Sequence, residues 1–301
     1  MSGANADTVR IFEEMARLAP ELGVATSTLS NGARVVDAGV SAPGSTEAGL
    51  LAARVTLGER ARVELRKEGG RTWVHVESED PALATLGCQF AAWMVPMGDS
   101  RGMASGPGRI LARKPKLLYE KLGLSERSDV AVFFLEADRL PTPDVADFLA
   151  RGCGLEPRAL RMVVAPPASP AGLVQICSRA LENGMLRLYN EGFPVGKIRK
   201  ARGRAPLAEP PPGKDPVPSL NDNIRFSGEA TAEVEWSPPE ELEGWAARAV
   251  TAGTPEEKKP FARILEEAMG DFRNIAVRVF SPAKFTFVET RSGKRFGAGK
   301  I

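Results

Sequence analysis

The stretch from Ser169 to Tyr189 carries the side chains best suited to catalysis. A serine cap and a first-turn proline fix the start of a helix there, so its phase follows at about 100° per residue. That phase places Gln175, Arg179 and Glu182 together, opposite a broad apolar face. A carboxylate held by a guanidinium can act as an oriented general base. The alternative is a solvated face, whose i,i+3 ion pair contributes only about 0.2–0.5 kcal/mol.

A second group, Ser105-Gly-Pro-Gly-Arg109, joins small residues to a cation. Glycine lets backbone amides approach an anion or a polar ring closely, and Arg109 adds charge. The group is neither a P-loop nor a dinucleotide fingerprint, so a plain turn is the alternative interpretation. Asp37 and Glu47 likewise flank a glycine-containing junction between a strand and a helix, a place where α/β proteins often bind ligands.

A basic run precedes a proline-rich stretch, and it comprises Lys197, Arg199, Lys200, Arg202 and Arg204. A solvated surface explains it most simply, an acidic tail of a ligand is the next interpretation, and RNA comes third. The whole chain has 40 Lys and Arg against 38 Asp and Glu, a net charge of +2. Such a balance does not suit a protein that grips a polyanion, so no nucleic-acid partner is expected.

Histidine and cysteine are scarce. His75 is the single histidine, in a strand-like alternation, and the three cysteines are Cys88, Cys153 and Cys177. Catalytic zinc sites, Ser-His-Asp triads and Cys-His dyads all need imidazole. Acid–base chemistry therefore falls to carboxylates, arginine, lysine or bound water, and no metal site is expected. Three scattered cysteines make no disulfide framework and fit a reducing cytoplasm.

Nothing in the sequence indicates export or a membrane. The first residues place acids inside the apolar pattern, where a signal peptide needs a basic start and an unbroken apolar core. No segment approaches the roughly 20 uninterrupted apolar residues that span a bilayer. We therefore expect a cytoplasmic protein with no membrane partner.

These residues need a scaffold, and the hydrophobic spacing predicts an α/β fold. With 301 residues, 43% of them hydrophobic and 26% charged, the chain is long enough for about two domains. Helices are expected over 9–22, 45–57, 81–89, 141–152, 169–189, 239–250 and 260–269, and strands over 26–29, 34–37, 60–65, 72–77, 130–135, 160–165, 224–226, 232–236, 284–289 and 295–296.

The expected organisation is two mixed α/β domains side by side. We place an N-terminal domain over 1–128 and a C-terminal domain over 129–301, and segments can be exchanged between the two. The stretch 203–219 is dense in proline and is expected to be extended rather than regular structure.

Several short motifs stand in a characteristic order along nearly the whole chain. They are Asn31–Asp37, Glu47–Leu50, Asp80-Pro81, Ser105–Arg109, Val164–Pro166, Ala168-Ser169, Gly172, Val174-Gln175, Arg179-x-x-Glu182, Asn221-Asp222, Pro260-Phe261, Asp271-Phe272 and Phe280–Ala283. In this order and spacing the sequence resembles the methenyltetrahydromethanopterin cyclohydrolase family.

The resemblance implies a hydrolase of one-carbon metabolism. Its substrate would be N5,N10-methenyl-tetrahydromethanopterin, or the dephospho form, and its product N5-formyl-tetrahydromethanopterin. No metal and no redox cofactor are implied, and the subunit would be α/β with a cleft between two domains. The family habit is a cytoplasmic homotrimer, with formaldehyde oxidation as one setting.

The resemblance also assigns roles to residues of this sequence. Glu182 would be the general base and Arg179 would orient it, since a methenyl bridge is a cationic amidinium that needs an oriented water and a proton acceptor. Asn221 and Asp222 would match the donors and acceptors along a pterin edge. The full substrate-binding set is Ser105, Gly106, Arg109, Gln175, Asn221 and Asp222.

An alternative is a divergent paralogue that is non-catalytic or binds a different pterin. Ser219-Leu220 stands where the family usually has Arg-Thr, and Ala276 stands where an acid is usual. These departures adjoin presumed substrate contacts, so they bear on specificity and activity more than on the fold.

Overall fold

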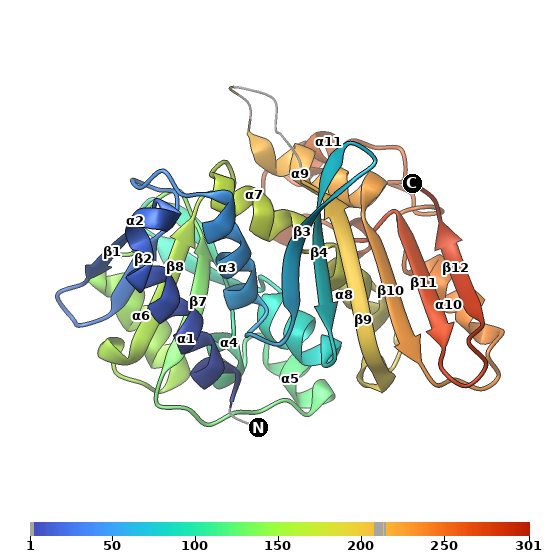
Figure 1. Ribbon diagram of the computed structural model, residues 1–301, viewed down its shortest axis with the longest axis horizontal. Helices are drawn as coiled ribbons and strands as arrows, with labels where there is room; N and C mark the ends of the chain where they lie inside the picture. The colour runs from blue at the N-terminus through green and yellow to red at the C-terminus, as the bar shows by residue number, and fades with distance from the viewer. Residues whose placement is uncertain (1–2, 208–212, 214) are drawn as a thin grey trace. The chain divides into compact units, whose positions relative to one another are not determined.

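The computed structural model describes residues 3–207, 213 and 215–301 (Figure 1). The chain divides into two units, each assembled from two stretches. Unit 1 is Met1–Ala61 with Leu86–Ile176, and unit 2 is Arg62–Thr85 with Cys177–Ile301. The division expected after residue 128 falls inside unit 1, because the strand that follows it hydrogen bonds to unit 1 strands on both sides.

Unit 1 is built on a six-stranded mixed sheet with the order β1-β2-β8-β7-β6-β5. β2, β8 and β7 are parallel, so their carboxyl ends share one edge of the sheet, while the other neighbouring pairs are antiparallel. The strands are β1 (Ala25–Thr28), β2 (Arg34–Asp37), β5 (Trp93–Met97), β6 (Ser100–Ser105), β7 (Ala131–Glu136) and β8 (Leu160–Ala165).

Helices pack on both faces of this sheet. In β7, Val132 and Phe134 pack in one core with side chains of α1 and α3, while Phe133 and Leu135 pack in a second core with α6. Alternate side chains of a strand point to opposite faces, so a continuous apolar run is what a sheet covered on both faces needs. The helices are α1 (Ala4–Arg17), α2 (Ala19–Leu22), α3 (Thr46–Thr56), α4 (Gly108–Ala112), α5 (Lys116–Leu122), α6 (Pro143–Cys153), the 3₁₀ turn η2 (Pro157–Ala159), α7 (Pro170–Cys177), which ends in the first residue of unit 2, and the π-helix η1 (Ala82–Gln89), which begins in unit 2.

Unit 2 has its own six-stranded sheet, in the order β12-β11-β10-β9-β4-β3. Only β10 and β11 are parallel, and the remaining neighbours are antiparallel. The strands are β3 (Arg62–Glu68), β4 (Arg71–Ser78), β9 (Ile198–Pro206), β10 (Glu229–Val234), β11 (Lys284–Glu289) and β12 (Arg295–Gly299).

Helix α8 lies against one face of the unit 2 sheet. Glycines permit the close approach: a Cβ on Gly203 would stand 2.6 Å from the backbone nitrogen of Leu181, and one on Gly184 would stand 2.8 Å from the ring of Phe285. The helices are α8 (Ala180–Asn190), α9 (Pro216–Ser227), α10 (Glu241–Arg248), α11 (Phe261–Glu267) and the 3₁₀ turns η3 (Val195–Lys197), η4 (Phe272–Asn274) and η5 (Val277–Val279).

Two expectations for this region are wrong. The stretch 203–219 is regular at both ends, since β9 runs to Pro206 and α9 begins at Pro216; residues 208–212 and 214 between them lie outside the described part. The strand expected over 224–226 is also helix, because Asp215 accepts a hydrogen bond from Val217 N at 3.0 Å and Pro216 suits a first helical turn. The cap and the proline that start this helix lie several residues before Ile224 and Phe226, whose alternation favours a strand.

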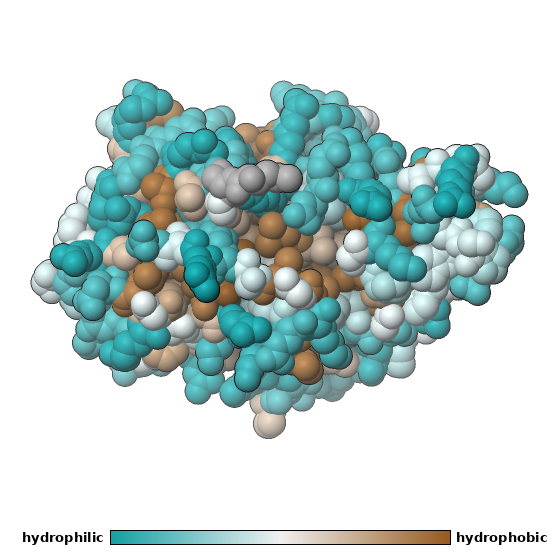
Figure 2. Space-filling model, turned by 90° about the horizontal axis from the view of Figure 1, so that it is seen from below, coloured by the Kyte–Doolittle hydropathy of each residue, from teal (hydrophilic) through white to brown (hydrophobic). Residues whose placement is uncertain are grey.

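The basic run lies on η3 and β9, and acids on other strands of the same sheet neutralise part of it. Lys200 Nζ stands 2.6 Å from Glu77, and Arg204 Nη2 stands 2.5 Å from Glu229 while its Nη1 pairs with Glu68. Figure 2 shows a face of the molecule on which hydrophilic residues surround separate hydrophobic areas. Among residues 3–207, 213 and 215–301, no helix combines the length and apolar composition of a membrane span.

Candidate active site

The helix expected over 169–189 is interrupted at the residues singled out for catalysis. Ser169 caps its first part through a 3.0 Å hydrogen bond from Gly172 N, and α7 ends at Cys177. Residues 178 and 179 form a turn, and α8 starts at Ala180 with Arg179 at its N-cap position. The interruption puts Glu182 in the first turn of α8, where the helix dipole favours a negative charge.

Arg179 and Glu182 are a buried pair. Arg179 Nη1 stands 3.7 Å from Glu182 Oε2, and the two side chains are 10% and 5% exposed. The alternative of a solvated face is therefore wrong for these residues. A carboxylate withdrawn from bulk water beside a fixed guanidinium can accept a proton from a water molecule held in a defined direction.

Gln175, one turn before the break, is fully buried in unit 1. Its Nε2 donates a 2.7 Å hydrogen bond to Glu136 Oε2, at the carboxyl end of β7. Sequence reasoning missed Glu136, although an acid directly after the buried run 131–135 is a usable signal. Ligands of open α/β sheets bind outside the carboxyl ends of parallel strands, and β7 is one of these.

Asp37 lies at the same edge of the sheet, at the end of β2. Its two carboxylate oxygens accept hydrogen bonds of 2.7–3.0 Å from the backbone N–H groups of Gly39, Val40, Ser41 and Ala42. Asp37 therefore organises the loop that leads toward α3.

The glycine turn follows β6. Ser105 is fully buried, and its Oγ has no hydrogen-bond partner in the described part of the chain. Gly106 adopts φ +102°, and a Cβ there would stand 2.9 Å from Val132 O. The turn therefore needs glycine for both its conformation and its packing, and it brings one orphan hydroxyl with it.

Arg109 acts on the chain itself. The side chain is fully buried, and it donates hydrogen bonds to the carbonyl of Lys114 at 2.8 and 3.0 Å and to those of Leu86 and Cys88 at 3.4 and 3.3 Å. Tyr119 Oη donates to Gly87 O at 2.7 Å. Together these donors satisfy carbonyls in the last turn of the π-helix η1, so we interpret Arg109 as a positioning residue for that segment.

Asn221 and Asp222 lie on α9. Asn221 Nδ2 donates to Val217 O at 2.9 Å, within the helix. Both Asp222 oxygens accept from Phe261 N, at 2.9 and 3.0 Å, and Oδ1 also accepts from Arg225 Nη1 at 2.8 Å. Burial raises the pKa of the Asp222 carboxyl, and these hydrogen bonds act in the opposite direction.

Arg225 completes this anchor. It is 1% exposed and donates to the carbonyls of Lys259 and Glu256 at 2.9 and 2.6 Å. The Asp222 carboxylate therefore helps to hold the segment 256–261 onto α9. Leu220, one of the departures noted above, is fully buried in the same helix, whereas Ser219 bonds back to Pro216 O at 2.8 Å.

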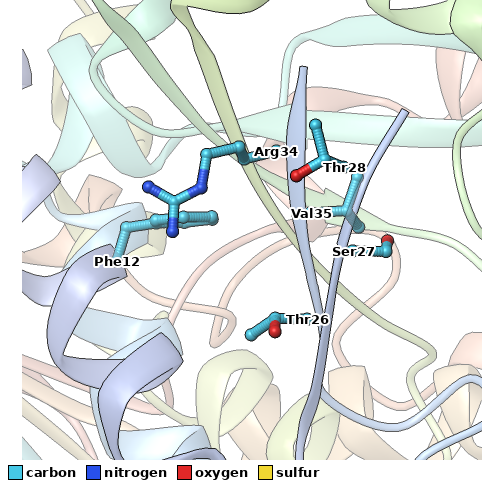
Figure 3. Close-up of a pocket in the computed structure, with 6 residues that line it drawn as sticks. All are labelled: Phe12, Thr26, Ser27, Thr28, Arg34 and Val35. Carbon is cyan, nitrogen blue, oxygen red and sulfur yellow. The ribbon is translucent and has the colours of Figure 1, made fainter. Parts of the chain in front are cut away.

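A pocket in unit 1 has none of the expected site residues in its lining. It is lined by Phe12 of α1 and by residues of the β1–β2 hairpin: Thr26, Ser27, Thr28, Arg34 and Val35 (Figure 3). The guanidinium of Arg34 lies 5.2 Å from the centre of the Phe12 ring, and Arg34 also pairs with Glu13. Its cation is thus already engaged by the protein.

No group of three or more His, Cys, Asp or Glu side chains placed to hold a metal ion occurs within residues 3–207, 213 and 215–301. The expected site residues are divided between the two units. Unit 1 holds Ser105, Gly106, Arg109 and Gln175, and unit 2 holds Arg179, Glu182, Asn221 and Asp222.

The family model described as Cyclohydrolase (MCH) matches residues 3–301. A protein of Methanococcoides burtonii is 35% identical over 307 residues, covering 100% of this chain and 96% of the relative. Proteins of Methanocaldococcus jannaschii and Methanothermobacter marburgensis are each 34% identical, again over 100% of this chain and over 96% and 97% of the relatives. All three relatives carry the name methenyltetrahydromethanopterin cyclohydrolase.

Proposed function

Because the chain belongs to the cyclohydrolase (MCH) family, we propose that it hydrolyses the methenyl bridge of N5,N10-methenyl-tetrahydromethanopterin, or of the dephospho form, to the N5-formyl derivative. The family match supports the reaction class. The observation that carries the proposal on this chain is the buried Arg179–Glu182 pair, since a protein that only binds a pterin has no need of a buried base.

The chemistry follows from the charge of the substrate. The methenyl carbon is part of a delocalised amidinium cation, so it is already electrophilic and needs an oriented water rather than further activation. As the water oxygen bonds to that carbon, Glu182 accepts a proton. The hydroxyl of the adduct then loses its proton as the bond from carbon to N10 breaks. N10 takes the proton that Glu182 accepted, and the carbon stays on N5 as a formyl group. One proton is released to solvent for each water consumed.

Arg179 directs the base. A nearby cation weakens a carboxylate as a base, but it also keeps the carboxylate ionised and fixed in direction. With a cationic electrophile the loss of basicity is tolerable. The catalytic roles proposed are therefore general base for Glu182 and positioning of base and water for Arg179.

Direct contact with the substrate is proposed for Ser105 and Gly106 in unit 1 and for Asn221 in unit 2. Gln175 contributes through Glu136, to which it donates a hydrogen bond. Asp222 contributes by holding the segment 256–261 onto α9. The orphan Oγ of Ser105 supports its part. Arg109 contributes by holding the end of the π-helix.

We propose further that the reaction needs no metal and no redox cofactor, and that the enzyme is a cytoplasmic homotrimer that serves formaldehyde oxidation. The scarcity of histidine and cysteine supports metal independence, and the small number and wide spacing of the three cysteines fit a reducing compartment. Sedimentation velocity of the purified protein tests the trimer directly.

The test of the activity mixes purified protein with methenyl-tetrahydromethanopterin and follows the methenyl absorbance. We expect decay faster than in buffer, and much slower decay with Glu182→Gln. Decay at the buffer rate, with folded protein that binds the substrate, would instead support the non-catalytic paralogue.

A further inference from the structure

Asp222, which was expected to bind the pterin ring, is already hydrogen-bonded within its own chain. Both oxygens of Asp222 accept the Phe261 amide, and Oδ1 also takes the guanidinium of Arg225. A carboxylate committed to anchoring its own chain has little capacity left for a ligand. The ring edge therefore needs another acceptor.

That edge has a defined chemistry. In a pterin, the 2-amino group and the ring N3–H point the same way, as two parallel donors. A carboxylate accepts such a pair through both oxygens, in the geometry that it uses for a guanidinium. The acceptor must be reachable by a ligand, held in orientation, and not already saturated by the protein.

Glu136 meets these requirements. It ends β7 at the edge where the parallel strands β2, β8 and β7 terminate, and it is partly exposed. Its Oε2 is fixed by the fully buried Gln175, at 2.7 Å. Its Oε1 receives no hydrogen bond or ion pair from residues 3–207, 213 or 215–301. Asp37, the other acid at this edge, is saturated by four backbone N–H groups.

Gln175 gives the arrangement its orientation. Because a carboxylate only accepts, Gln175 must present its Nε2 to Glu136, which fixes the amide and the plane of the carboxylate. Gln175 is also four residues before Arg179 and seven before Glu182 in the chain. One short segment therefore carries both the support of Glu136 and the catalytic pair.

We propose that Glu136 is a substrate-binding residue that accepts the 2-amino and N3–H donors of the tetrahydropterin ring, with Gln175 as its positioning residue. The inference rests on the proposed function for the identity of the ligand. It assigns ring recognition to the carboxyl edge of the unit 1 sheet.

The test compares wild type, Glu136→Gln and a matched control, Asp138→Asn, which alters an exposed acid two residues further on. Each is assayed with methenyl-tetrahydromethanopterin and with its analogue that lacks the 2-amino group. Wild type should prefer the natural substrate by about ten- to a hundredfold in kcat/KM, the range of a charge-assisted hydrogen bond. Glu136→Gln should lose most of this preference through KM, with kcat within a few-fold, and Asp138→Asn should keep it.

A merely structural role would weaken both substrates equally and leave the preference intact, which would overturn the proposal. Glu136→Asp provides a second variant if the glutamine form does not fold: its carboxylate is withdrawn by one methylene group, so the preference should shrink. A preference that either folded variant keeps in full also overturns the proposal.

Calorimetric titration with tetrahydromethanopterin, which lacks the one-carbon unit and cannot react, separates the two proposals. If wild type binds it but hydrolyses nothing, the proposed function fails, and weaker binding by Glu136→Gln still supports ring recognition. If wild type hydrolyses the substrate and Glu136→Gln binds tetrahydromethanopterin as wild type does, only the present inference fails.

Discussion

Arg179 and Glu182 differ physically from an ion pair on a helix surface. Exposed pairs contribute about 0–1 kcal/mol, and their partners can be removed singly at little cost. In a buried pair, removal of one partner leaves an uncompensated charge, at a cost of about 3–5 kcal/mol. With side chains 10% and 5% exposed, this pair is of the second kind. We therefore expect Arg179 to contribute to stability as well as to the proposed hydrolysis.

Glu182→Gln should lower kcat by roughly 10²- to 10⁴-fold, the usual cost of losing a general base. Glutamine keeps the size of the side chain, so the fold and KM should change little. Steady-state kinetics with the methenyl substrate, together with circular dichroism, measure both quantities. The matched control is Glu191→Gln, directly after the last residue of the same helix. The Glu191 carboxylate pairs with Arg187 at 2.9 Å, and its side chain is 27% exposed.

Arg179→Ala should also slow turnover, and the double variant with Glu182→Gln should lose less than the product of the single losses, because the two residues act as one unit. Independent, multiplicative losses would contradict the joint role. A parental rate in Glu182→Gln would place the base elsewhere.

For single residues, the sequence indicates which side chains are suited to chemistry, but it does not show their burial or their hydrogen-bond partners. The helical phase groups Gln175, Arg179 and Glu182, but it cannot show burial, which depends on the break after α7. It also cannot show that Arg109 and Asp222 spend their hydrogen bonds on distant carbonyls and amides of their own chain. Such partners lie many residues away, so no local pattern announces them.

Among the elements, the end of the π-helix η1 depends on side chains from outside it. Arg109→Met and Arg109→Lys should each lower the free energy of unfolding by on the order of 2–4 kcal/mol. Methionine has no donor for the three carbonyls that Arg109 binds, and the single ammonium of lysine cannot reach them all as the guanidinium does. Urea denaturation measures the change, and Arg151→Met, an exposed arginine on α6, is the control. Unchanged stability with a raised KM would instead support a direct contact with substrate.

The turn between β11 and β12 is held by an acid. Glu289 Oε2 accepts from Ser292 Oγ and Ser292 N, each at 2.7 Å, and Oε1 accepts from Arg291 N at 3.0 Å. The Ser292 hydroxyl first, and then these backbone amides, lower the pKa of Glu289 to about 2. Its ordinary value is 4.5, so the folded state favours the ionised form.

The stabilisation from Glu289 is therefore complete above about pH 4.5 and is lost as the pH falls toward 2. Glu289→Gln should lower Tm at pH 7. The difference in Tm between this variant and wild type should shrink as the pH is lowered from 4.5 to 2. Glu233→Gln, on the neighbouring sheet strand β10, is the control. A difference that stays constant over this range would refute the assignment.

Elements with strong local signals were predictable, and those defined by partners were not. The apolar run of β7 predicts a buried strand and the serine cap of α3 predicts the start of a helix. Both elements lie within one residue of the expected bounds. By contrast, the sequence did not predict β5 and β6. Gly98, Gly102 and the charged residues between them are typical of a loop, and these strands form because β6 pairs with both β5 and β7. The charged strand β9 was missed for the same reason, since its place lies between β4 and β10.

For the molecule as a whole, the predicted α/β class is confirmed, and the structure has two six-stranded mixed sheets. The cleft between domains stays a prediction. The composition predicts chemistry without a metal, because three cysteines and one histidine are too few and too scattered for a soft-ligand site. Hydrolysis should therefore persist after exhaustive dialysis against EDTA. Loss of activity that zinc restores would contradict this.

The interleaving of the two units has a consequence for the nascent chain. The β3–β4 hairpin is made early, but the strand that completes the edge of β4 is β9, which begins about 120 residues later. At about 5–20 residues per second, that edge waits roughly 6–24 s on the ribosome. An open strand edge recruits foreign strands, and charged side chains discourage this. Arg71 and Glu77 place charges on β4 itself, so they discourage foreign pairing along this edge while the protein is still being translated.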